Sequence, residues 1–218
     1  MTFTTSRAAL HAVAEHILGP GRYAVDGHIG LEACPGGFTT PVLSSTEGCL
    51  RLAVIGTQLH VRDATGDRAA PLTTLADLAT FADIVPGMPS SVYQPTTPLD
   101  LDAPLLVDPD DAVVIARWFS LTSNALASLD WTPDATLWPE HFDLGCSVDE
   151  VNYGGSPGDD GHPEPYLYVG PWSPRQGDFW NEPFGASIGH EVVHTVADAV
   201  AFFTEGRSLA SGSQVVHP

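Results

Sequence analysis

Three residues near the C-terminus, His190, Glu191 and His194, form the motif His-Glu-x-x-His. On a helix this spacing places both imidazoles on one face, where they can bind Zn²⁺ with the glutamate beside the metal. The glutamate can then take a proton from a metal-bound water, as the general base of a hydrolase. Apolar residues recur at helical spacing at Val192, Val196, Val200 and Phe203. The sequence therefore predicts a helix that starts near Ser187 and suggests a zinc-dependent hydrolase.

A catalytic zinc ion needs a third protein ligand, and the residues after the motif supply one poorly. Glu205 comes eleven positions after His194, about 16 Å further along a continuous helix. Asp198 lies one turn beyond His194, but three ligands in a line along one helix do not converge on a tetrahedral ion. The candidates upstream are His141, His162, Asp159 and Asp160. The alternative is that both histidines lie half-exposed on an amphipathic helix and bind no metal.

A second group of ionisable side chains lies in residues 153–165, a stretch rich in glycine and proline. The flanking residues 142–148 and 166–169 are predicted to be paired strands, which makes the stretch between them a hairpin loop. Its hard oxygen ligands for a divalent cation are Asp159, Asp160 and Glu164. The alternative is a solvated turn, in which glycine and aspartate supply the required backbone angles.

The first predicted helix has an apolar stripe from Leu10 to Leu18 and is predicted to end at Gly19-Pro20-Gly21. His11 and Glu15 share a face of this helix, and His16 lies next to them. We expect either a solvated or hydrogen-bonded edge, or an edge that faces a ligand.

Other elements follow from alternation and turn residues. The predicted strands are 28–34, 38–43, 50–55 and 58–62, followed by a polar turn over 64–70. Thr74 and Asp77 predict the start of a short helix, and residues 84–108 are too rich in proline for regular structure. Asp108-Pro109 starts a helix that we expect to reach about Leu129 and to pack on the sheet.

The composition restricts the class of protein and its partners. With 218 residues, 43% of them hydrophobic, the chain can bury a core, and we expect a single domain over residues 1–218. All eight basic residues are arginine, beside 27 acids, which gives a formal charge of −19. Such a charge repels phosphate backbones and anionic lipid, so we expect neither nucleic acid nor membrane partners. The oligomeric state is not predicted.

The cysteines and the first residues indicate a cytoplasmic protein. Cys34, Cys49 and Cys146 are odd in number and widely spaced, as is typical of reduced thiols. The first twenty residues lack the basic start and apolar run of a signal peptide, and no span of 18 apolar residues occurs.

Several short motifs resemble an uncharacterised bacterial family, common in actinobacteria, that is known only as a domain of unknown function. The likeness rests on Pro71-Leu72-Thr73-Thr74, Trp138 with Phe142-Asp143-Leu144, Ser156-Pro157-Gly158-Asp159, Pro163-Glu164-Pro165-Tyr166 and the ending Phe202-Phe203. This resemblance implies a shared fold rather than an activity. It also implies that a common site lies near Trp138, Asp143, Asp159 and Glu164, and the family's closing helix does not require His-Glu-x-x-His.

Together these patterns predict an α+β protein, with an antiparallel sheet in two sequence blocks, a central packed helix and flanking terminal helices. The blocks are residues 23–62 and 136–170. We expect first a small-molecule-binding protein or an enzyme of unestablished type, whose site lies between the 156–165 loop and the strand at Asp143. The residues expected to bind are Trp138, His141, Asp143, Asp159, Asp160, Glu164 and Tyr168. The alternatives are the zinc hydrolase and a structural or assembly protein without a small-molecule site.

Overall fold

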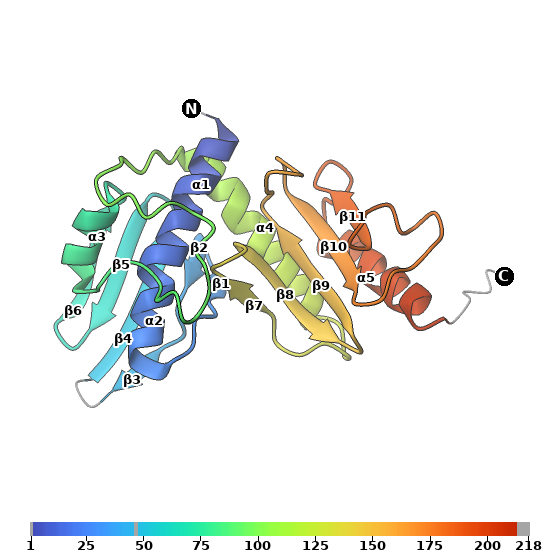
Figure 1. Ribbon diagram of the computed structural model, residues 1–218, viewed down its shortest axis with the longest axis horizontal. Helices are drawn as coiled ribbons and strands as arrows, with labels where there is room; N and C mark the ends of the chain where they lie inside the picture. Colours follow the sequence, from blue (N-terminus) through green and yellow to red (C-terminus); the bar gives the residue numbers. More distant parts are fainter. Residues whose placement is uncertain (1, 46–47, 213–218) are drawn as a thin grey trace. The chain divides into compact units, whose positions relative to one another are not determined.

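The computed structural model describes residues 2–45 and 48–212. It has helices and two antiparallel sheets, which confirms the α+β class (Figure 1). Its contacts divide the chain into two compact units, Met1–Arg117 with Leu137–Phe142, and Trp118–Thr136 with Asp143–Pro218. Each unit is described by itself below. A single domain stays a prediction, because compactness alone does not establish that either unit folds independently.

Three consecutive helical segments open the first unit: α1 (Phe3–Val13), a π-helical turn (Ala14–Leu18) and α2 (Gly19–Asp26). The predicted end of the helix at Gly19-Pro20-Gly21 is therefore wrong. Pro20 has no N–H to donate to the carbonyl of His16, and that carbonyl instead accepts from the Gly87 N–H at 3.0 Å. The helix continues because another segment supplies the hydrogen bond that proline removes.

The predicted histidine and glutamate edge of this helix is buried and hydrogen-bonded. The carboxylate of Glu15 accepts from the backbone N–H groups of Thr96 and Thr97, at 2.9 and 2.7 Å, and from the Thr97 hydroxyl at 2.5 Å. His16 Nε2 lies 2.9 Å from the same hydroxyl, and His11 Nε2 lies 2.9 Å from the carbonyl oxygen of Pro139. These contacts attach the proline-rich segment to the helix.

The first sheet has the order β1-β2-β4-β5-β6, and β3 pairs with β4. Its strands are β1 (Glu32–Cys34), β2 (Gly37–Thr39), β3 (Leu43–Ser45), β4 (Gly48–Ile55), β5 (Gln58–Asp63) and β6 (Gly66–Pro71). The polar turn predicted over 64–70 is wrong, because β6 pairs with β5 along six residues. Both faces of β6 are polar or weakly apolar, so the sequence lacks the expected alternation.

One face of the first sheet is covered by helices and the other is open. Leu52 and Leu59 are fully buried on the covered face. A Cβ atom added to Gly21 of α2 would lie 2.6 Å from Leu52 Cδ1, so this glycine permits the helix to approach the sheet closely. The unit is completed by α3 (Leu75–Ala82), which starts at the predicted Thr74 cap.

The second sheet has the order β11-β10-β9-β8-β7. Its strands are β7 (Thr136–Trp138), β8 (Asp143–Val148), β9 (Val151–Ser156), β10 (Tyr166–Pro171) and β11 (Ala186–Gly189). Along the chain they lie between α4 (Pro109–Ala127) and α5 (Val196–Ala210). The predicted helix near 109–129 is confirmed, with Ile115, Phe119 and Leu126 buried.

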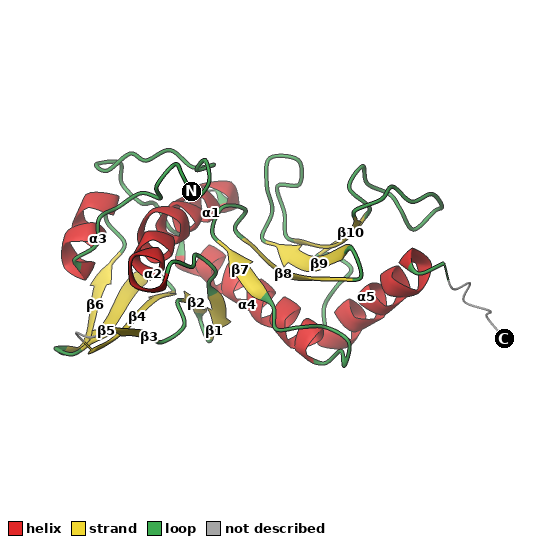
Figure 2. Cartoon of the chain, turned by 60° about the horizontal axis from the view of Figure 1, so that its bottom comes forward, coloured by secondary structure: helices red, strands yellow, loops and turns green. Residues whose placement is uncertain are grey.

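In the second unit, too, the helices contact one face of the sheet. Figure 2 shows α4 and α5 on the same side of these strands. Phe203 of α5 and Trp131 both lie edge-on to the ring of Tyr153 of β9. On the opposite face, β10 carries Tyr166 and Tyr168. Helix, antiparallel meander and helix thus occur in the same order twice along the chain.

The part of the chain that the structure describes contains no helix that is both long enough and apolar enough to span a membrane.

Candidate functional site

The His-Glu-x-x-His motif does not lie on a helix, so that prediction is wrong. Strand β11 ends at Gly189, residues 190–192 form a turn, and α5 begins only at Val196. Thr195 and Asp198 form a capping box, in which each side chain binds the other residue's backbone N–H. This cap fixes the start of α5 after the motif rather than before it.

Without the helix, His190 and His194 are not one helical turn apart, which was the basis of the zinc prediction. The ring of His190 instead lies beside Glu191, with 3.8 Å between Nδ1 and Oε2. Within residues 2–45 and 48–212, no three His, Cys, Asp or Glu side chains are grouped so as to hold a metal ion. The zinc hydrolase remains a prediction that lacks its geometric support.

The predicted pairing of residues 142–148 with 166–169 is wrong, because β9 lies between β8 and β10, and the loop covers only residues 157–165. In this loop, Asp159 has a conformational role. One carboxylate oxygen accepts from the backbone N–H groups of Gly161 and His162, at 2.7 and 2.8 Å, and the other accepts from the Tyr166 hydroxyl at 2.6 Å. Partial burial raises the pKa of Asp159, but these hydrogen bonds outweigh it and hold the pKa below its usual value. Asp160 and Glu164 are exposed.

The structure brings together two other predicted binding residues, Asp143 and Tyr168, which bind each other. The Tyr168 hydroxyl donates to Asp143 Oδ2 at 2.5 Å. The tyrosine lies against the backbone of Gly154, where an added Cβ atom would come within 2.4 Å of Tyr168 Oη. Trp138 and His141 are exposed residues of the first unit, whereas Asp143 and Tyr168 belong to the second.

A hollow of about 440 Å³ lies beside the 157–165 loop, and its lining includes His162, Glu182 and Ser187. We call it the loop hollow. His162 Nε2 lies 2.9 Å from Glu182 Oε1, and the Ser187 hydroxyl donates to the same oxygen at 2.9 Å. Partial burial raises the pKa of Glu182, but these two hydrogen bonds hold it below its usual value. Because Ser187 binds the carboxylate and not the imidazole, the arrangement is not that of an activated serine nucleophile.

The loop that carries Glu182 is attached to the edge of β11 by a side chain. Asn181 Nδ2 donates to the Ser187 carbonyl at 3.1 Å, and its Oδ1 accepts from the Ser187 N–H at 2.9 Å. The sequence prediction missed Glu182 and Ser187 because it placed the start of a helix near Ser187, where the structure has β11.

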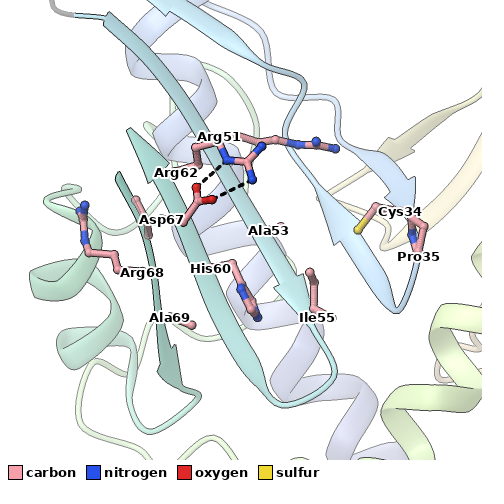
Figure 3. Close-up of a pocket in the computed structure, with 11 residues that line it drawn as sticks. Cys34, Pro35, Arg51, Ala53, Ile55, His60, Arg62, Asp67, Arg68 and Ala69 are labelled. Carbon is pink, nitrogen blue, oxygen red and sulfur yellow. Dashed lines mark hydrogen bonds and ion pairs between the residues drawn. The ribbon is translucent and has the colours of Figure 1, made fainter. Parts of the chain in front are cut away.

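A second hollow, of about 470 Å³, lies on the open face of the first sheet, and we call it the sheet hollow (Figure 3). The strand register explains its position. Ala53, His60 and Ala69 are opposite one another on β4, β5 and β6 and form a row with two short side chains. Pro35 and Ile55 are also among the lining residues. The two short side chains leave a depression between the longer ones beside them.

The adjacent row contains the ionic groups of the sheet hollow. Arg51, Arg62 and Asp67 are opposite one another on the same three strands. Arg62 binds Asp67 through two hydrogen bonds, of 2.5 and 2.8 Å, drawn as dashed lines in Figure 3. Arg51 donates from Nε to the Thr39 hydroxyl at 3.0 Å, and its guanidinium extends toward the side on which Cys34 lies.

Cys34 at the rim of the sheet hollow is a weak nucleophile. Burial raises the pKa of its thiol, and nearby Arg51 only partly offsets this effect. The reactive form of cysteine is the thiolate, so a raised pKa reduces reactivity at neutral pH. The lining of the sheet hollow thus provides apolar contacts, a guanidinium and an imidazole, which are groups for binding.

The sequence contained part of the signal for the sheet hollow. Arg51, Ala53 and Ile55 alternate with buried Leu52 and Val54, which places them on one face of a strand. Since β6 was not predicted, Asp67 and Ala69 could not be aligned with them.

Comparison with known proteins gives no further guide to the site. No protein-family model matches the chain, and neither a curated protein nor a solved structure matches it. The predicted resemblance to a bacterial family therefore stays a prediction.

Proposed function

We propose that this protein binds a small molecule in the sheet hollow. The observation that carries the proposal is the row of Ala53, His60 and Ala69, which leaves a concave surface of about 470 Å³ in a size range typical of ligand sites. Such sites combine apolar walls with a few polar groups that orient the ligand. Here the walls include Pro35 and Ile55, and His60 lies in the middle of the row.

Binding is favoured over catalysis by the character of the lining. The Arg62 guanidinium is occupied by Asp67, and the Cys34 thiol has a raised pKa. A covalent reaction needs a nucleophile activated by a base or by a lowered pKa, and the Cys34 thiol has the opposite shift. A binding protein therefore fits the sheet hollow better than an enzyme.

The experiment that tests the proposal fills the hollow. Ala69 is exposed on the edge strand β6, so Ala69→Trp can place an indole over the row without entering the core. The matched control is Ala201→Trp, on an exposed position of α5 in the second unit. Ligand-detected NMR against a library of small acids, amides and amines should give hits that Ala69→Trp loses and Ala201→Trp keeps. Hits that bind Ala69→Trp as well as the natural protein would overturn the proposal.

The second candidate function is small-molecule binding in the loop hollow, close to where the sequence predicted a site. The observation that favours it is the contact of His162 with Glu182, which places an imidazole and a carboxylate at the hollow as polar groups that can orient a ligand. In this case His162→Gln and Glu182→Gln should each abolish binding, whereas Ala69→Trp should leave it unchanged. The same NMR screen distinguishes the two sites.

A cytoplasmic location without a nucleic acid partner is part of the proposal. It is supported by the formal charge of −19 and by the absence of a disulfide at Cys34, Cys49 and Cys146.

A further inference from the structure

We infer that the ligand of the sheet hollow is a carboxylate with a single negative charge and an apolar body. This inference rests on the proposed function and adds the chemical class of the ligand. It depends on a different observation, which is the charge balance around the hollow rather than its shape.

Two arginines lie opposite each other at the hollow. Arg51 on β4 and Arg62 on β5 are cross-strand partners, and like charges in such positions destabilise a sheet. Asp67 neutralises Arg62 through two hydrogen bonds. Arg51 has no carboxylate within 4.0 Å among residues 2–45 and 48–212, and its Nε donates to an uncharged hydroxyl, that of Thr39. A bound anion would supply the missing partner.

The charged side chains that line the hollow are mostly arginines. The three arginines of the lining are Arg51, Arg62 and Arg68. Arg62 pairs with Asp67, and Arg68 pairs with Asp63 at 2.5 Å. Among the residues that the structure describes, Arg51 is thus the one arginine of the lining without a carboxylate partner. One uncompensated positive charge matches one negative charge on the ligand. The formal charge of −19 on the whole chain opposes multiply charged ligands such as polyphosphates more strongly than monoanions.

The guanidinium of Arg51 and the apolar lining suit the two ends of such a ligand. A guanidinium binds a carboxylate through two parallel hydrogen bonds. Within residues 2–45 and 48–212, Arg51 donates only from Nε, so its two terminal nitrogens can make such a pair. Ala53, Ile55 and Ala69 offer apolar contacts beside it for the rest of the ligand. Three of the eight basic residues of the chain line this one hollow. The rest of this acidic chain therefore offers few other positive sites to a small anion.

The test compares matched ligands that differ only in charge. Titration calorimetry with hexanoate, hexanamide and hexylamine, and with inorganic phosphate, measures the preference in the natural protein. Hexanoate should bind at least about tenfold more tightly than hexanamide, since a charge-assisted pair contributes more than a neutral hydrogen bond. Hexylamine and phosphate should bind more weakly still. Equal affinity for the acid and the amide would overturn the inference.

Arg51→Met keeps most of the length of the side chain and removes its charge. It should abolish the preference for hexanoate and leave the affinity for hexanamide unchanged. Arg51→Lys should restore part of the preference, because it restores charge without the two parallel donors. The control Arg175→Met removes an exposed arginine of the second unit and should change nothing. Thermal unfolding of each variant checks that the fold is intact, and an unchanged hexanoate affinity in folded Arg51→Met would contradict the inference.

The two proposals fail in distinguishable ways. If Ala69→Trp abolishes binding of both acid and amide but the natural protein has no preference for the acid, the hollow is the site and the ligand class is wrong. If Ala69→Trp binds both compounds normally, the proposed function itself is wrong.

Discussion

The hydroxyl of Tyr168 and the carboxylate of Asp143, 25 residues apart in the chain, form a hydrogen bond of 2.5 Å within the second unit. We predict that Tyr168→Phe lowers the free energy of unfolding by about 1.5–3 kcal/mol, because the bond is to a charged group and half-buried. Urea unfolding checks this value. Tyr23→Phe is the control, since no hydrogen bond of its hydroxyl is found in the described chain. If Asp143 served only to bind a ligand, Tyr168→Phe would be as stable as the natural protein.

Glu15 should be essential for holding the proline-rich segment in place. Glu15→Ala removes the acceptor of two backbone N–H groups, those of Thr96 and Thr97, and we expect a loss of about 2–4 kcal/mol in stability. Hydrogen exchange at these two amides should become much faster than in the natural protein. Glu32→Ala, an exposed acid of the same unit, should alter neither quantity. Slow exchange at Thr96 and Thr97 in Glu15→Ala would contradict the assignment.

Acid should destabilise the β5–β6 hairpin through Asp63. Hydrogen bonds from Thr65 and Arg68 lower the pKa of Asp63 to about 2. A carboxyl group with a lowered pKa in the folded state binds fewer protons than in the unfolded chain, so its stabilisation is present at neutral pH. It should be lost as the pH falls from about 4 toward about 2.

Asp63→Asn should therefore make the urea midpoint less dependent on pH over this interval. Asp160→Asn, at an exposed position of the second unit, serves as the control and should leave the pH dependence as it is. Identical pH profiles for Asp63→Asn and the natural protein would show that the hairpin contacts do not contribute.

Elemental analysis of protein purified without chelators should find far less than one zinc ion per chain, because the motif is divided between a turn and a loop. His190→Ala combined with His194→Ala should leave metal content and thermal stability unchanged. About one zinc per chain, lost in the double variant, would return the hydrolase to consideration, with Glu191→Gln as the next variant to assay.

The start of α5 should depend on Thr195. Thr195→Ala removes the side chain that caps the Asp198 N–H, and a loss of about 1 kcal/mol is expected. Thr195→Ser keeps the hydroxyl and should retain most of the stability. Circular dichroism during thermal unfolding measures both. If Thr195→Ala unfolds at the same temperature as the natural protein, the cap does not determine where this helix begins.

Elements with a strong local signal could be predicted from the sequence. Thr74 with Asp77 identified the start of α3, and Asp108-Pro109 identified that of α4. The helix predicted for His-Glu-x-x-His was wrong because the spacing of its apolar residues is compatible with a helix but does not require one. The capping box at Thr195 and Asp198 was a competing signal in the sequence, and it determined the boundary.

Strands such as β6 and β9 were not predicted, because their residue types suit tertiary contacts and have little intrinsic preference for strands. In β9, Gly154 and Gly155 read as a loop, but they are required because Tyr168 and Thr122 lie against them. Neither contact can be seen in the sequence. For the same reason the sheet hollow could not be predicted, since it needs the register of three strands, one of which was missed.

The side-chain amide of Asn181 covers part of the outer edge of β11. It occupies both backbone groups of Ser187 that a neighbouring strand would use, on the outer side of β11. An uncovered strand edge is a template on which a second chain can add its own strand and begin a fibril. Asn181 therefore leaves neither backbone group of Ser187 available for pairing with a second chain, within a strand of only four residues.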